Sequence, residues 1–149
     1  MSTLTEPGTG SALATRLERV RMASFGALTM LVLQFVIGTA YNLYGTAPTA
    51  KKSVGLFSSP LLAIHVILGI LLVIVAAVLV FRAVQAKSGA VLATSIAGLV
   101  AILAAGGAGS SFAQDGADGA SLGMAIATAV AMLCYAASLV IIPHGKRQG

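Results

Sequence analysis

Charged side chains are scarce in this chain: they make up 9% of its 149 residues, whereas soluble proteins carry about 25%. Hydrophobic residues make up 58% of the sequence, and the mean hydropathy is +0.98. Such a composition is untenable for a soluble domain of this size, so it excludes that class and indicates a membrane protein. The length allows one domain and no sizeable module outside the membrane.

Cysteine is almost absent. Cys134 is the single cysteine, so the chain cannot form an internal disulfide and carries no signal about a redox compartment. Because Cys134 lies inside the last apolar run, we expect a buried and inert thiol there.

Acidic residues are also few, with four Asp and Glu against nine Lys and Arg, which gives a net charge of +5. The basic residues stand in pairs and triplets beside apolar runs instead of forming one patch. Attraction to the anionic cytoplasmic leaflet explains this distribution better than nucleic-acid binding, so no nucleic-acid partner is predicted.

What the chain does have is four long apolar runs separated by short charged islands. They predict membrane-spanning helices at about residues 22–43, 60–82, 89–108 and 120–142. The first run would cover about 33 Å at 1.5 Å per residue, which is enough for a hydrocarbon core of about 30 Å. The expected fold is therefore all-α, a four-transmembrane-helix antiparallel bundle.

The flanking segments have a different composition. Residues 1–10 are small and polar and predict a disordered tail, whereas residues 143–149 form a basic tail after a helix-stopping proline. The four-helix membrane domain is expected over residues 11–142. From Ser11, apolar residues at helical spacing alternate with arginines, which predicts a short amphipathic helix on the inner surface or an extension of span one.

The basic residues fall mainly in alternate islands. These are Arg16, Arg19 and Arg21, then Arg82 and Lys87, then Lys146 and Arg147. By the positive-inside rule, both termini are expected in the cytoplasm. The absence of organelle-type targeting favours a prokaryotic cell membrane.

A signal peptide is the alternative interpretation of the first span. The arginines, the apolar run and the small-x-small string Gly38-Thr39-Ala40 imitate one. The run is longer than the usual ~7–15 residues, so we expect span one to be retained.

Helix boundaries and packing also leave local signals. Ser58 or Ser59 can cap span two, and Pro60 suits its first turn. Small residues recur at every fourth position in spans three and four: Ala93, Ala97, Ala101, Ala105 and Gly109, then Gly119, Gly123, Ala127 and Ala131. Because small residues let helices approach closely in lipid, these two spans should form the tightest contact. The segment 106–110 is interpreted as a frayed helix end, since it lacks the ending of a phosphate loop.

Within the predicted membrane depth there are no Asp, Glu, Lys or Arg residues, apart from Arg82 at a boundary. Their absence argues against ion-coupled transport and against hydrolysis. Hydroxyl side chains within the spans are expected to bond to the backbone or to a neighbouring helix: Ser24, Thr29, Thr39, Thr94, Ser95, Ser121, Thr128 and Ser138.

His65 is the polar residue best suited to binding or chemistry, because an imidazole in a membrane needs a hydrogen-bond partner, a metal or water. One interpretation is a hydrogen bond to Gln34, Asn42 or an outer-loop carbonyl. The other is an axial ligand to haem b between facing helices, with Met124 at similar depth as the second ligand. Lys51 and Lys52 would then meet the propionates. Met124 alone is typical of core packing.

Two strings, LQFVIGTAYNLYG and HVILGILLVIVA, together with the Gly-rich GGAGSSF, resemble one four-helix half of a haem A synthase or a small b-type membrane cytochrome. The resemblance covers the four spans and implies a haem site that uses His65. The family pattern expects a second histidine near the start of span four, where this chain has Met124 or Ala125.

The leading functional interpretation is a non-enzymatic membrane component, an accessory or partner subunit whose small-residue surfaces suit association with another membrane protein or a second copy. The alternatives are a haem-b protein for electron transfer or haem handling, and a small-solute pore or transporter. A pore would need a polar stripe facing inward, and the spans show little of one.

Overall fold

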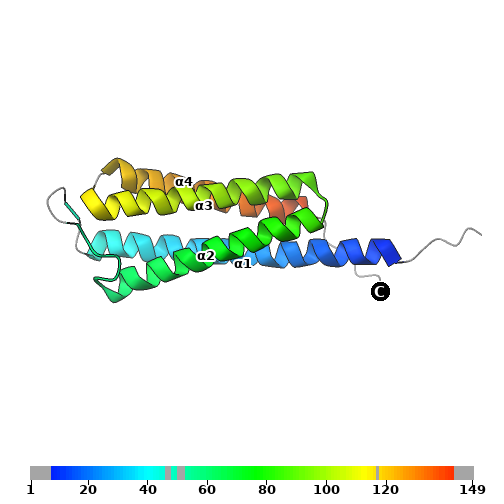
Figure 1. Ribbon diagram of the computed structural model, residues 1–149, viewed down its shortest axis with the longest axis horizontal. Helices are drawn as coiled ribbons and strands as arrows, with labels where there is room; N and C mark the ends of the chain where they lie inside the picture. The colour runs from blue at the N-terminus through cyan, green and yellow to red at the C-terminus, as the bar shows by residue number, and fades with distance from the viewer. Residues whose placement is uncertain (1–7, 46–47, 50–52, 117, 143–149) are drawn as a thin grey trace, which may run out of the picture.

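The computed structural model describes residues 8–45, 48–49, 53–116 and 118–142, and it is all-α (Figure 1). The helices are α1 (Gly8–Tyr44), α2 (Pro60–Gln85), α3 (Gly89–Asp115) and α4 (Asp118–Ile141). Each contains a stretch long and apolar enough to cross a membrane. Large apolar side chains such as Phe25, Val100 and Leu133 are exposed on the outside, as a lipid-facing surface requires.

Each helix packs against two others. Contacts join α1 to α2, α2 to α3, α3 to α4 and α4 to α1, and the pair α3 and α4 makes the most extensive contact, as predicted. Figure 1 shows that α1 and α3 finish where α2 and α4 begin. We call this the Tyr44 end, and the opposite end, where α2 finishes and α3 begins, the Gln85 end.

Helix α1 is a single element of 37 residues, about 55 Å long. The amphipathic segment expected near Ser11 is therefore an extension of span one. Its first turns project beyond the other helices at the Gln85 end (Figure 1), and Arg16 Nη1 donates to the carbonyl of Gln85 at 3.1 Å. Residues 8–10, expected in the disordered tail, are helical, whereas residues 1–7 and 143–149 lie outside the described residues.

The start of α2 follows the predicted signals. Ser59 is the N-cap in extended conformation, and its side-chain oxygen accepts a hydrogen bond from the Leu62 N–H at 3.2 Å. Pro60 occupies the first turn, where its missing N–H has no consequence. The cap and the proline together fix the start of α2, and so the position of His65.

Helix α3 is longer than predicted, because the segment 106–110 is helical and not frayed. The helix ends at Gly116, whose φ of 70° is left-handed and whose N–H donates to the Phe112 carbonyl at 2.8 Å. Glycine weakens a helix by about 1 kcal/mol per residue. Unwinding inside lipid would leave backbone groups without partners at a cost of several kcal/mol each, so the helix persists.

The packed core lies toward the Gln85 end. Tyr135 of α4 is fully buried, and so are Ala27, Ala76 and Leu79. A Cβ on Gly98 of α3 would lie 2.8 Å from Cζ of Tyr135, so the phenol ring rests on the glycine backbone. This contact joins α3 and α4 at a level where Ala97 of the predicted stripe is exposed.

The predicted stripe in α3 is only partly an interface. Ala93 and Ala97 are exposed, whereas Ala101 is buried and Ala105 half-buried. A row of every fourth residue rotates about 40° per step on a helix of 3.6 residues per turn, so it leaves the interface after a few steps. The stripe in α4 moves inward instead, from exposed Gly119 to buried Ala131.

Most hydroxyl groups in the spans bond as predicted. Side chains donate to the carbonyl one turn earlier in their own helix: Thr29, Thr94, Ser95, Thr128 and Ser138. Thr94 and Ser138 also join α3 to α4 through their hydroxyl oxygens, 2.7 Å apart. Ser24 differs, because its buried oxygen has no hydrogen-bond partner.

Candidate functional site

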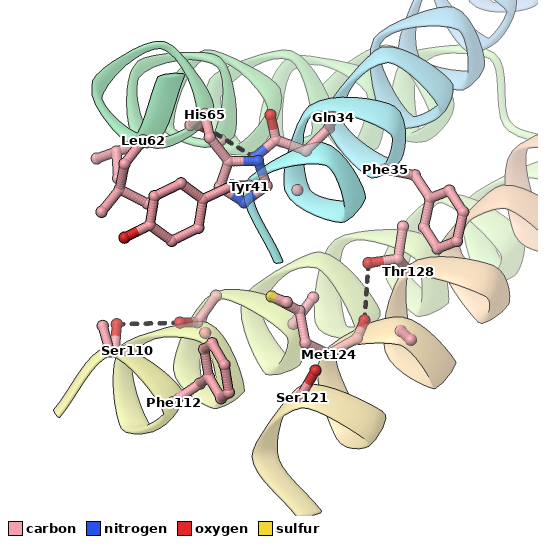
Figure 2. A pocket seen from close by; sticks show the side chains of 18 of the residues that line it. Gln34, Phe35, Tyr41, Leu62, His65, Ser110, Phe112, Ser121, Met124 and Thr128 are labelled. Atoms are coloured by element: carbon pink, nitrogen blue, oxygen red, sulfur yellow. Dashed lines mark hydrogen bonds between the residues drawn. The ribbon is translucent and has the colours of Figure 1, made fainter. Parts of the chain in front are cut away.

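A cavity of about 620 Å³ lies at the Tyr44 end, between the pair α1 and α2 and the pair α3 and α4. Figure 2 shows its walls, which come from all four helices. Its volume falls within the range of roughly 300–1,000 Å³ that small-molecule sites occupy. Pro48, Val54 and Leu56 of the connection between α1 and α2 add to the lining.

Glycines reduce the bulk of the α3 wall of this cavity. On the α3 wall, a Cβ on Gly106 or Gly107 would meet no heavy atom within 4 Å. Beside them, a Cβ on Gly109 would lie 3.2 Å from the sulfur of Met124. The Gly-rich segment that the sequence analysis interpreted as a frayed end is thus the α3 wall of the cavity.

His65 lines the cavity from α2 and is half-buried. Its imidazole lies against Gly38 of α1, where a Cβ would come within 2.9 Å of Cε1 and 3.4 Å of Nδ1. Nδ1 is buried and has no hydrogen-bond partner, whereas Nε2 is not both buried and unpartnered. Glycine at position 38 is therefore what lets the Cε1 edge of the ring approach α1, with Nδ1 enclosed.

Gln34 of α1 contacts His65, although not in the predicted way. Its Nε2 donates to the main-chain carbonyl of His65 at 2.8 Å, and not to the imidazole. Gly69 allows this approach, since a Cβ there would lie 3.1 Å from that nitrogen. Asn42 bonds instead to Ser121 Oγ at 3.5 Å, so neither amide provides a partner for the ring.

Met124 lies on the wall opposite His65 (Figure 2), with its sulfur beside Gly109. The structure thus brings both predicted axial ligands to one cavity. Lys51 and Lys52, predicted to meet propionates, lie outside the described residues.

Several other polar side chains in the lining already have hydrogen bonds. Ser110 donates to the Gly106 carbonyl at 3.0 Å, and Thr128 donates to the Met124 carbonyl at 2.8 Å. Among the described residues that line the cavity, none is Asp, Glu, Lys or Arg. The described part of the chain also contains no group of three His, Cys, Asp or Glu residues placed to hold a metal ion.

Gly38 and Gly69 were not predicted from the sequence as neighbours of His65 and Gln34. The signal that could have found Gly38 is depth. It lies six residues before the end of α1, and His65 lies five residues after the start of α2, which begins at the end of the bundle where α1 finishes, so the two residues lie at a similar depth. Comparisons with protein-family models, curated proteins and solved structures found no match for this chain.

Proposed function

We propose that this chain is a non-enzymatic component of a prokaryotic cell membrane, and that its function is to hold a small, largely apolar molecule in the cavity at the Tyr44 end. In this proposal the four helices form an antiparallel bundle with both termini in the cytoplasm, because the arginines near the start of α1 and the basic link after α2 belong to the same side. The cavity of about 620 Å³ is the observation that carries the proposal.

The composition of the lining supports binding over catalysis. Apolar side chains and glycines dominate it, and its polar groups are amides, hydroxyls, a phenol and one imidazole. General acid–base or nucleophilic chemistry needs a reactive group paired with an orienting base. Such a pair is not formed by the described lining residues, whereas an apolar pocket with a few convergent polar groups is typical of a ligand site.

A cavity that ends inside the bundle also fits better than a pore. Toward the Gln85 end, the described core is packed by Leu72, Ala76, Leu79 and Tyr135, which are almost or fully buried. A continuous aqueous path would have to cross this apolar layer, where water has few polar partners. We therefore place the ligand in the half of the bundle near the Tyr44 end.

The test adds a larger side chain to the α3 wall of the cavity. Gly106→Leu adds a side chain where a Cβ meets nothing within 4 Å, and Gly26→Leu is the matched control. Gly26 is equally open, lies on α1 and does not line the cavity. Organic extracts of the wild type and both variants, purified in parallel, would be compared by mass spectrometry.

We expect a small molecule that is enriched with the wild type and with Gly26→Leu and is depleted at least tenfold with Gly106→Leu. Equal recovery from all three proteins, or no enriched molecule in the wild type, would contradict the proposal. Size-exclusion chromatography checks that each variant is folded and equally dispersed.

Haem b is the second candidate ligand, and the specific observation in its favour is that His65 and Met124 line facing walls. Two features rank it below a neutral ligand. A histidine that binds metal through Nε2 normally donates its other N–H to an acceptor, whereas Nδ1 of His65 is buried without a partner. No basic side chain stands in the described lining to neutralise two propionates.

The visible absorption spectrum decides between these ligands. Protein expressed with ample haem and purified in detergent should show no Soret band if the ligand is neutral. A Soret band with reducible α and β bands, lost in His65→Ala and kept in Gly26→Ala, would replace our proposal with the haem function.

A further inference from the structure

From the lining of the cavity, we infer that its ligand is a neutral, lipid-soluble molecule with an oxygen atom that accepts a hydrogen bond from Nε2–H of His65. This inference rests on the proposed ligand-binding function and specifies the chemistry of the ligand. Three features of the described residues carry it: the charge of the lining, the hydrogen bonds already formed there, and the surroundings of the two ring nitrogens.

The charge of the ligand follows from the lining. Asp, Glu, Lys and Arg do not occur among the described residues that surround the cavity. A charge taken from water into an apolar site without a partner is strongly unfavourable. A carboxylate, a phosphate or an ammonium group would find no counter-charge there, so the part of the ligand inside the cavity is neutral.

The position of its polar atom follows from which protein groups are occupied. Ser110 and Thr128 bond to carbonyls of their own helices, and Asn42 bonds to Ser121. Gln34 uses its amide nitrogen on the backbone of His65, and its oxygen, which can only accept, is buried without a hydrogen-bond partner. Two donors of the described lining, the Thr39 hydroxyl and the imidazole of His65, have no hydrogen bond of their own, and the imidazole is the more enclosed of the two.

The direction of the hydrogen bond follows from the ring nitrogens. Nδ1 lies against Gly38 and is buried without a partner, so a proton placed on Nδ1 would have no acceptor. The neutral ring instead carries its proton on Nε2, the nitrogen that is not buried without a partner, and in our inference this N–H donates to the ligand. The matching ligand atom is an acceptor, the oxygen of a carbonyl or a hydroxyl group.

The test compares two photoactivatable probes that differ in one group. One is a long-chain ketone with a diazirine on its chain, and the other is the same chain with CH₂ in place of the carbonyl. The full chain in lipid nanodiscs is illuminated with each probe, and labelled positions are found by mass spectrometry. Labelling around Leu133, which is exposed on α4, corrects for how each probe distributes in the bilayer.

We expect the ketone to label the cavity residues about fivefold more than the alkane, the factor that one net hydrogen bond supplies. In His65→Phe, which keeps a flat ring but has no N–H, the two probes should label equally. His65→Gln, which restores an N–H donor, should regain part of the preference. If His65→Phe does not fold, the wild-type comparison and His65→Gln still decide.

The labelling results distinguish a failure of the hydrogen-bond inference from a failure of the proposed ligand-binding function. Equal labelling by both probes in the wild type, with a loss in Gly106→Leu, would overturn the hydrogen-bond inference and leave the ligand-binding function standing. The same holds for a ketone preference that persists in His65→Phe. Cavity labelling by neither probe would overturn both.

Discussion

Tyr135 is the largest fully buried side chain among the described residues. Its hydroxyl oxygen is buried without a hydrogen-bond partner. Its ring is held by shape, because Gly98 provides a flat patch of backbone on α3. In lipid, close packing of this kind replaces the hydrophobic effect as the force between helices. The contact is therefore a sensitive position in the fold.

Gly98→Ala should destabilise the protein by about 1–3 kcal/mol, the usual effect of overpacking a core. The added methyl group would lie 2.8 Å from Cζ of Tyr135, and the ring has no space to move in the packed layer. Gly26→Ala, where a Cβ meets nothing within 4 Å, is the control and should be close to neutral. Unfolding in mixed micelles with increasing denaturing detergent would measure both, and equal stabilities would contradict the contact.

Single residues were predictable from the sequence only where chemistry alone identified them. His65 stood out because it is the imidazole inside an apolar span, and the structure places it on a cavity wall. The pairing of Tyr135 with Gly98 was not predictable, since it depends on the rotation of α3 against α4. The same dependence hid the hydrogen bond from Gln34 to the backbone of His65.

At the scale of the helices, local signals and the membrane determine different boundaries. The start of α2 was predicted correctly because Ser59 and Pro60 act within one turn. The end of α3 was not, because the glycines at 106 and 107 predict a break that only the need to satisfy the backbone in lipid prevents. The position of a helix end inside the membrane therefore depends more on the surrounding lipid than on the helix propensity of the residues.

Ser59→Ala should destabilise the protein by about 1 kcal/mol, since its oxygen accepts from the Leu62 N–H. Ser88→Ala is the matched control, because Ser88 is the N-cap of α3 but makes no side-chain capping bond. Its substitution should change the stability by no more than a few tenths of a kcal/mol. The same detergent unfolding experiment measures both. An equal effect at the two positions would show that the capping bond does not contribute.

At the scale of the whole molecule, the bundle is asymmetric along its axis. It is packed near the Gln85 end, where Tyr135 fills the interior, and open near the Tyr44 end, where glycines line a cavity. The number of spans was predictable from four apolar runs. The cavity was not, because its volume comes from how two helix pairs separate, which no local pattern records.

Topology can be checked directly. Fusing a reporter that is active only outside the cytoplasm should give activity after the connection between α1 and α2, within residues 53–57, and none after Lys87. The physical reason is that the positive-inside rule favours the cytoplasmic side for Arg16, Arg82 and Lys87. Activity after Lys87 would reverse the proposed orientation of the bundle.

The open glycine wall of α3 has a consequence for how this protein could change over time. A Cβ added at Gly106 meets no heavy atom within 4 Å, so under the proposed function the size of the ligand and the stability of the fold are set by different residues. If alanine, valine and leucine are placed at this position in turn, the size of the largest molecule that binds should decrease from one variant to the next, while the helices stay in place. Single substitutions at such a wall could thus change the size of the molecule that the pocket binds without changing the fold.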